Sequence, residues 1–336
     1  MHSNRGFPAG QVHTVWLDSC LLEGNLLGDP VQRRIDVYFP HGSSGEGLPL
    51  LVDVVGFLSG GPAHSNWRNF GENLPQRLDR LIAEGSLPPV VVAMPDCFTR
   101  LGGNQYINSD AMGPWADVLR QEVVPLVENT WHCGGTGRRG IFGKSSGGYG
   151  AMVHALLYPE FWAAAACHSG DMAFELMFLP EFPNVLRALA SHKFNIQSWL
   201  EEFYSKPKQK GSDLHILLML AMCASFDPDP EAYMGIRLPV DTHTCELIPE
   251  RWHRFMRWDP LQIAAEQGKG MKQLKALFID CGTQDQYNLL YGSRRMHRLL
   301  EQQGIAHVYE EFKDDHSSID YRLDRSLPLL AKALVQ

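Results

Sequence analysis

The fold is indicated by eight residues near the middle of the chain, which read Gly143-Lys144-Ser145-Ser146-Gly147-Gly148-Tyr149-Gly150. They follow residues 139–142, an apolar stretch typical of a short buried strand, and lead into residues 149–157, which have a helical pattern. A Gly-x-Ser-x-Gly pattern between a strand and a helix predicts a sharp turn that exposes the serine as a nucleophile. The glycines two positions before and after Ser145 are needed because the neighbouring chain passes too close for a Cβ atom.

Two other interpretations of this segment have to be weighed. It could be a Gly/Ser-rich loop that simply leads into a helix, since a five-residue pattern also occurs by chance. A phosphate-binding loop would need a glycine five positions before Gly143, and Arg138 stands there instead. Ser146 is the adjacent competitor for the nucleophile, but only Ser145 has glycines on both sides at the required spacing.

The segments around this turn alternate between strand-like and helix-like patterns. Apolar runs bounded by turn residues predict buried strands, and apolar residues at helical spacing predict helices between them. This alternation indicates an α/β fold with a mostly parallel central sheet flanked by helices. The predicted strands are residues 34–39, 48–55, 89–94, 139–142, 161–167, 276–281 and 308–312, and the predicted helices are residues 73–84, 115–131, 149–157 and 321–334.

About a hundred residues separate the last strand before Asp171 from the strand that starts at Ala276, far more than an ordinary connection in such a fold. We therefore expect a core of residues 1–170 and 274–336, interrupted by a largely helical cap or insertion at residues 171–273. The insertion is rich in Phe, Met, Leu and Trp, which suggests an apolar wall for an acyl or aryl group, or simply a core of its own. The run 215–223 could alternatively be a core helix of the main domain.

A nucleophilic serine needs a histidine base and a carboxylate that orients it, and hydrolases of this type place them after the serine in the order Asp, His. Asp285 lies on the loop after the strand 276–281, and His316 lies on the loop after the strand 308–312. Both loops leave the edge of the sheet where ligands of α/β folds bind. Asp285 could also be an ordinary turn residue, and the rivals are Asp280, inside its strand, and His168.

Two backbone N–H groups are expected to stabilise the negatively charged oxygen of the reaction intermediate. The first belongs to Ser146, at the start of the helix after the nucleophile. The second is expected from the loop after an early strand, where Phe57 follows Gly56. A glycine-rich stretch that only turns the chain is the alternative.

The amino-acid composition argues against several classes of protein. The 336 residues carry 30 basic and 38 acidic side chains, a net charge of −8, which argues against nucleic acid as a partner. No apolar stretch approaches the roughly 20 residues of a membrane-spanning helix, and residues 1–16 do not resemble a signal peptide. The seven scattered cysteines, without CxxC pairs or zinc-ligand spacing, suggest reduced thiols in the cytoplasm and no metal site.

The ordered set of motifs resembles the esterase D-like "putative esterase" family of α/β hydrolases, which includes S-formylglutathione hydrolases, enterochelin esterases and mycolyltransferases. The resemblance covers most of the chain outside the insertion, and only the serine motif is specific by itself. It rests on residues 24–30, 37–40, 94–96, 104–109, Trp115, residues 122–126, 142–151, 168–171, 282–285 and the loop around His316.

The resemblance implies Ser145 as nucleophile, His316 as base and then acid, Asp285 as the orienting carboxylate, and Phe57 as an oxyanion donor. This chain departs from the family pattern at two places. Val55 stands where many α/β hydrolases have a polar residue or histidine, and Lys144 replaces the commoner histidine before the nucleophile. Lys144 is therefore expected to alter the local charge and the substrate preference.

The sequence predicts a serine carboxylic-ester hydrolase that works through an acyl-enzyme and needs no cofactor. Acyl transfer or thioester hydrolysis by the same triad is the nearest alternative, and a non-catalytic binding protein of the same fold is a more distant one. The expected partner is a small-molecule ester. The number of chains that assemble, including a homo-oligomer, is left open by the sequence.

Overall fold

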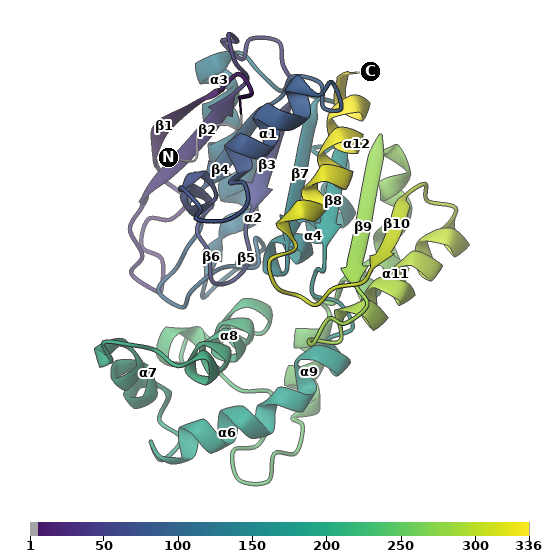
Figure 1. Ribbon diagram of the computed structural model, residues 1–336. Helices are drawn as coiled ribbons and strands as arrows, with labels where there is room; N and C mark the ends of the chain where they lie inside the picture. The colour runs from purple at the N-terminus through teal and green to yellow at the C-terminus, as the bar shows by residue number, and fades with distance from the viewer. Residues whose placement is uncertain (1–5, 336) are drawn as a thin grey trace.

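We describe the fold from a computed structural model, in which residues 6–335 are described. These residues form an eight-stranded sheet in the order β1-β2-β4-β3-β7-β8-β9-β10 (Figure 1). β2 runs antiparallel to β1 and β4, and all other neighbours are parallel. The sheet strands are β1 Gln11–Asp18, β2 Gln32–Phe39, β3 Leu50–Val54, β4 Val91–Pro95, β7 Arg139–Lys144, β8 Ala164–His168, β9 Ala276–Gly282 and β10 Val308–Phe312, and a small hairpin adds β5 Asn108–Ser109 and β6 Gly113–Pro114. The predicted mostly parallel α/β sheet is confirmed.

Helices cover both faces of the sheet. α1 and α12 pack on one face, where Leu78 and Leu330 join a core cluster with Phe142. α3, α4 and α11 belong to the larger cluster on the other face. The helices are α1 Leu74–Ala83, α2 Trp115–Asp117, α3 Val124–Trp131, α4 Ser146–Leu157, α5 Phe174–Met177, α6 Phe182–Ala190, α7 Ile196–Ser205, α8 Gly211–Phe226, α9 Pro249–Met256, α10 Pro260–Gln267, α11 Leu289–Gln303 and α12 Leu323–Val335.

The helix expected at residues 115–131 is present over that range but changes register within it, and local sequence explains both this change and how α1 begins. Asn73 caps α1: its side chain accepts a hydrogen bond from the Gln76 N–H at 2.9 Å, and the Gln76 side chain accepts one from the Asn73 N–H. Between α2 and α3 the chain instead forms a π-helical stretch, Val118–Val123. Pro125 lies two residues after it and has no N–H to donate to the preceding turn, which favours this wider register.

The segment between β8 and β9 is helical, from α5 to α10. Figure 1 shows α6 to α9 as a group lying beyond one end of the sheet. The run 215–223 lies within α8, which packs against α6 and α9 and also contacts β5, and α10 packs onto α4 and α11 of the core. The boundaries 171 and 273 remain a prediction; β8 ends at His168 and β9 begins at Ala276.

Residues 1–5 of the N-terminal stretch 1–16 lie outside the described residues, and Gln11 to Trp16 belong to β1. Among residues 6–335, none of the helices combines the length and apolar character needed to cross a membrane.

Candidate active site

Ser145 occupies the turn between β7 and α4 with a strained backbone. Its φ of 58° and ψ of −126° lie outside the regions that L-residues favour. The Ser145 N–H donates to the carbonyl of His168 at 3.0 Å, which ties the turn to the end of β8. The strand, turn and helix predicted from residues 139–157 are all present in this order.

The glycines on either side of Ser145 leave no room for a side chain. A Cβ atom on Gly143 would lie 2.1 Å from the carbonyl oxygen of Val54, and one on Gly147 would lie 1.8 Å from the same atom. The two glycines therefore let β7 and α4 approach the end of β3. This is the close approach that the spacing around Ser145 predicts.

The two adjacent serines have different environments. Ser146 is 1% exposed, and its hydroxyl oxygen accepts a hydrogen bond from Gln105 Nε2 at 2.8 Å. Ser145 instead lines a cavity. Of the two hydroxyl groups, the one on Ser145 is therefore placed to meet a ligand.

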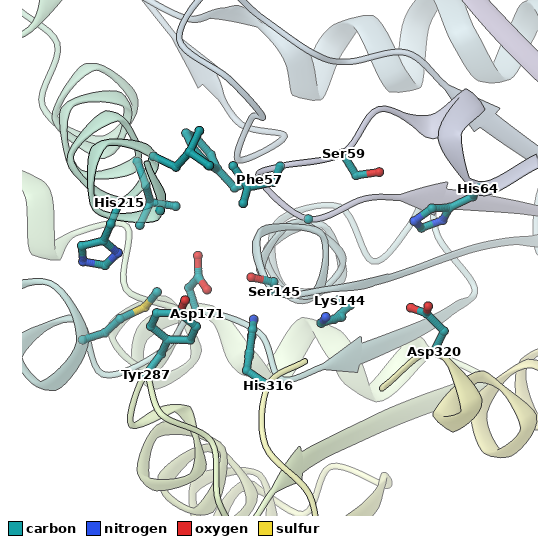
Figure 2. Close-up of a pocket in the computed structure, with 16 residues that line it drawn as sticks. Phe57, Ser59, His64, Lys144, Ser145, Asp171, His215, Tyr287, His316 and Asp320 are labelled. Carbon is teal, nitrogen blue, oxygen red and sulfur yellow. The ribbon is translucent and has the colours of Figure 1, made fainter. Parts of the chain in front are cut away.

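His316 and Asp285 form a hydrogen-bonded pair beside Ser145. His316 Nδ1 lies 2.7 Å from Asp285 Oδ2, and the Asp285 side chain is fully buried. Because an ionised carboxylate only accepts hydrogen bonds, Nδ1 carries the proton and Nε2 is left as an acceptor. Gln286 Oε1 accepts from the His316 N–H at 3.0 Å and fixes the loop. Figure 2 shows the His316 ring extending toward Ser145 in the same cavity.

The N–H groups of Phe57 and Ser146 are both free near the Ser145 turn. Neither donates a hydrogen bond to another group within residues 6–335. The Phe57 loop is fixed from two sides: Gly103 N–H donates to the Phe57 carbonyl at 2.8 Å, and the Tyr106 hydroxyl donates to the Val55 carbonyl at 2.6 Å. Both N–H groups are therefore available to a ligand atom.

The rival base and carboxylate lie away from the cavity lining. The ring of His168 is buried and bonds to Asp280 at 2.7 Å and to the Ser326 hydroxyl at 2.8 Å. Arg322 Nε donates to the second oxygen of Asp280 at 2.8 Å. Only the backbone carbonyl of His168 reaches the Ser145 turn.

The cavity around Ser145 has a volume of about 450 Å³, within the range of small-molecule sites. On one side of Ser145 lie groups from the insertion and the Asp285 loop, and on the other side lie charged groups (Figure 2). We call the first side the insertion arm, formed by Asp171, Met177, Leu214, His215, Leu218 and Tyr287. We call the second side the charged arm, formed by Ser59, His64, Lys144 and Asp320.

The charged arm contains a second histidine–carboxylate pair that sequence reasoning missed. His64 Nδ1 lies 2.6 Å from Asp53 Oδ2. Burial by itself would lower the pKa of His64, but the charge and hydrogen bond of Asp53 outweigh it, so the pKa is raised. The pair had no local signal, because Asp53 lies in an apolar strand and His64 in the glycine-rich loop that follows.

Lys144, which departs from the family pattern, lines the same arm. Burial lowers the pKa of its amine, and nearby carboxylates, first Asp320, only partly oppose this. Asp320 is itself bound to Arg68 at 2.6 Å. Lys144 therefore brings a basic group next to Ser145, as the departure from the family pattern predicts.

Asp171 is the second group that sequence reasoning did not single out. It is 1% exposed and lines the insertion arm. Burial, and secondly the negative charge of Asp285, raises the pKa of Asp171 to about 7. No group of three or more His, Cys, Asp or Glu side chains within the described residues is arranged to hold a metal ion.

A strained serine turn at the carboxyl edge of a mostly parallel sheet defines an α/β hydrolase. Within this class, the sequence matches the family described as "Putative esterase" over residues 30–324. The match covers most of the chain, so the protein belongs to this family and is an esterase. The family expected from the ordered motifs is confirmed.

Solved structures of similar fold include esterases and serine hydrolases. A ferulic acid esterase superimposes with a TM-score of 0.61 at 17% identity, covering 97% of this chain and 99% of that one. An S-formylglutathione hydrolase from Agrobacterium tumefaciens gives 0.61 at 17% identity, with 97% and 96% covered. The fluorophosphonate-binding serine hydrolase FphF from Staphylococcus aureus gives 0.58 at 16% identity, with 96% and 99% covered. These similarities extend over the whole fold.

Proposed function

We propose that the protein is a serine carboxylic-ester hydrolase with Ser145 as nucleophile, His316 as general base and Asp285 as its orienting carboxylate. The observation that carries this proposal is the shared cavity of Ser145 and His316, with the His316–Asp285 hydrogen bond of 2.7 Å behind it. In this arrangement the carboxylate fixes the ring and its tautomer, so that Nε2 can accept the serine proton.

The reaction proceeds through an acyl-enzyme. Ser145 Oγ attacks the ester carbonyl carbon while His316 Nε2 takes the hydroxyl proton. The N–H groups of Phe57 and Ser146 stabilise the negative oxygen, each by about 3 kcal/mol when correctly aimed. When the tetrahedral intermediate breaks down, its bond to the alcohol oxygen breaks, and the departing alcohol receives the proton from His316. Water then attacks the acyl-enzyme by the same route and releases the acid.

Hydrolysis of p-nitrophenyl esters of increasing acyl length by wild type and Ser145→Ala tests this proposal. We expect folded Ser145→Ala to lose roughly a thousandfold or more in turnover, because the attacking group is removed. Ser146→Ala should lose far less, since only its backbone N–H takes part. Circular dichroism confirms that each variant is folded.

A fluorophosphonate probe followed by mass spectrometry adds an independent readout. An adduct on Ser145 in wild type is the expected result, and equal esterase activity in wild type and Ser145→Ala would overturn the triad. A thioester and an ester of ferulic acid belong in the substrate series, because similar structures are those of S-formylglutathione hydrolases and ferulic acid esterases. Adding an alcohol acceptor distinguishes hydrolysis from acyl transfer.

We also propose that the protein acts in the cytoplasm. Its seven cysteines are free thiols in the structure, and five of them are buried. Free cysteines of this kind are expected in a compartment where disulfides do not form. Fractionation of cells that express the full-length chain, followed by detection of the protein, tests this proposal.

A further inference from the structure

Asp171 is a buried carboxyl group without a hydrogen-bond partner. Neither of its side-chain oxygens has a partner within residues 6–335, and the residue is 1% exposed. Figure 2 shows the carboxyl group pointing into the cavity, on the insertion-arm side of Ser145. Burying such a group unpaired is costly, so a binding role for it is the natural explanation.

No basic side chain of the insertion arm is left to pair with Asp171. His215 lies 3.0 Å from Glu181, and His316 lies 2.7 Å from Asp285. The histidines that line this part of the cavity are therefore already held by other carboxylates. Asp285 adds negative charge close to Asp171, and it contributes to the raised pKa of that carboxyl group.

The remaining walls of the insertion arm are apolar and aromatic. Met177, Leu214 and Leu218 line it, and the rings of His215 and Tyr287 are stacked with centroids 6.3 Å apart. The negative charges of Asp285, Glu181 and Asp171 also act on Tyr287, whose pKa is raised, first by burial. A positively charged ligand group here would meet a carboxylate with two free oxygens and an aromatic ring, both of which attract cations.

We propose that Asp171 binds a protonated amine of the substrate, so that this esterase acts on esters carrying an ammonium group on the portion held in the insertion arm. The inference rests on the proposed function for the scissile ester. An ammonium group can donate to both Asp171 oxygens and compensate the buried charge. A hydroxyl group has a single proton to donate and compensates no charge.

Six p-nitrophenyl esters of two lengths test the inference near pH 7.5, just above the Asp171 pKa of about 7. They are the 3-aminopropanoate, 3-hydroxypropanoate and butanoate, and the 6-aminohexanoate, 6-hydroxyhexanoate and heptanoate. At each length the amine, hydroxyl and methyl ends differ little in size. We expect kcat/KM for the amine ester to exceed that of its methyl counterpart at least about tenfold at one length.

The Asp171→Asn variant keeps the shape of the side chain and removes its charge. We expect it to abolish the amine preference, measured within this variant as the ratio of kcat/KM for the amine ester to kcat/KM for the methyl ester of the same length. Asp110→Asn, which removes an exposed carboxylate, is the control and should keep the preference. An amine preference that persists in Asp171→Asn, or an equal preference for the amine and hydroxy esters over the methyl esters, would overturn the inference.

Binding of hexylammonium chloride to the Ser145→Ala protein, measured by calorimetry, gives a result that does not depend on hydrolysis. We expect tenfold or more weaker binding when Asp171→Asn is added, and 1-hexanol should show no such difference. If hexylammonium binding depends on Asp171 but the amine esters are not preferred, the inference is supported, and the amine belongs to the alcohol portion of the substrate. Equal binding with and without the Asp171 charge, together with no ester preference, overturns it.

The same measurements separate failure of the inference from failure of the proposed function. If none of the esters is hydrolysed in a Ser145-dependent manner, the proposed function fails, and hexylammonium binding still decides the role of Asp171. If the methyl esters are hydrolysed through Ser145 without any effect of Asp171 in either assay, only the amine inference fails.

Discussion

At the scale of single residues, the site depends on glycines, which have no side chain, as much as on the residues whose side chains line it. Gly147 and Gly143 let β3 approach the turn, and Ser145 takes its strained conformation as a result. These requirements could be predicted from the Gly-x-Ser-x-Gly spacing because they are local. That Ser145 and His316 line one cavity, with Asp285 bonded to His316, could likewise be predicted, because strand ends of a parallel sheet meet at one edge.

Asp171 and His64 could not be predicted as members of the site. Their importance depends on which side chains do or do not face them from distant segments. Asp171 stands out only because the histidines near it are bound to other carboxylates. Absence of a partner is a property of the folded cavity and leaves no pattern in the sequence.

Replacing Gly147 by alanine should disrupt the turn. The new Cβ would lie 1.8 Å from the Val54 carbonyl oxygen, which belongs to the backbone and cannot move aside without shifting β3. We expect the free energy of unfolding to fall by about 3 kcal/mol or more, measured by chemical denaturation.

Gly211→Ala is the matched control, because a Cβ there meets nothing within 4 Å and the backbone needs no glycine. Its free energy of unfolding should stay within about 1 kcal/mol of wild type. Similar stabilities for the two alanine variants would contradict the steric account of the turn.

At the scale of elements, apolar strands and the amphipathic helices 73–84 and 321–334 were predictable, whereas an exposed edge strand and a largely polar helix were not. β3, β4 and β9 are buried throughout and appear in the sequence as apolar runs. β1 was missed because it is an edge strand in which Val15 and Leu17 pack on the core while Val12 and Trp16 are exposed, so its apolar residues do not alternate clearly with polar ones. α11 was missed as well; its mean hydropathy is low and many of its side chains face solvent.

Within α4, the buried His154 links the helix to neighbouring segments through hydrogen bonds of its ring. Trp162 Nε1 donates to His154 Nδ1 at 2.9 Å, so the proton is on Nε2, which faces the Tyr106 carbonyl at 2.7 Å. Both ring nitrogens are thus satisfied in the neutral form. Burial lowers the pKa of His154 from 6.5 to about 4.

This histidine should make the protein less stable in acid. The unfolded chain takes up a proton on His154 below about pH 6.5, whereas the folded chain does so only near pH 4. Stability from this group is therefore complete above pH 6.5 and is lost as the pH falls toward 4, by up to about 1.4 kcal/mol per unit.

Urea unfolding of wild type and His154→Gln across this pH range isolates the effect. The variant should be the less stable protein at neutral pH, because hydrogen bonds to Tyr106 and Trp162 are altered. The difference between the two should shrink toward pH 4, since glutamine cannot be protonated. A difference that stays constant with pH would contradict the role of His154.

At the scale of the whole molecule, the insertion is joined to the core through aromatic side chains. Phe174 is fully buried at the start of the insertion, and its ring lies 4.8 Å from Phe226 and 5.7 Å from Phe255, both in the insertion. It also lies 6.0 Å from Tyr149, on the helix that follows Ser145. A long connection between β8 and β9 was predictable, but this shared packing was not, because it joins residues far apart in the sequence.

We therefore expect core and insertion to unfold in one transition. Phe174→Ala should lower the free energy of unfolding by about 3–5 kcal/mol without splitting that transition, as followed by calorimetry and near-ultraviolet circular dichroism. Phe70→Ala, which removes a ring that is 90% exposed, should leave the transition where it is. A separate early transition for the insertion in wild type would show that the two parts are not coupled.

The hydrogen bonds of His168 have a consequence for how such sites are recognised. Ser326, His168 and Asp280 form a second serine–histidine–aspartate chain with hydrogen bonds of 2.8 and 2.7 Å, so a search by interatomic distance alone would report a triad here, apart from the triad proposed at Ser145. All three residues are at most 2% exposed, and Arg322 neutralises Asp280. The second triad is sealed from any substrate, so access rather than geometry distinguishes a reactive serine from a structural one.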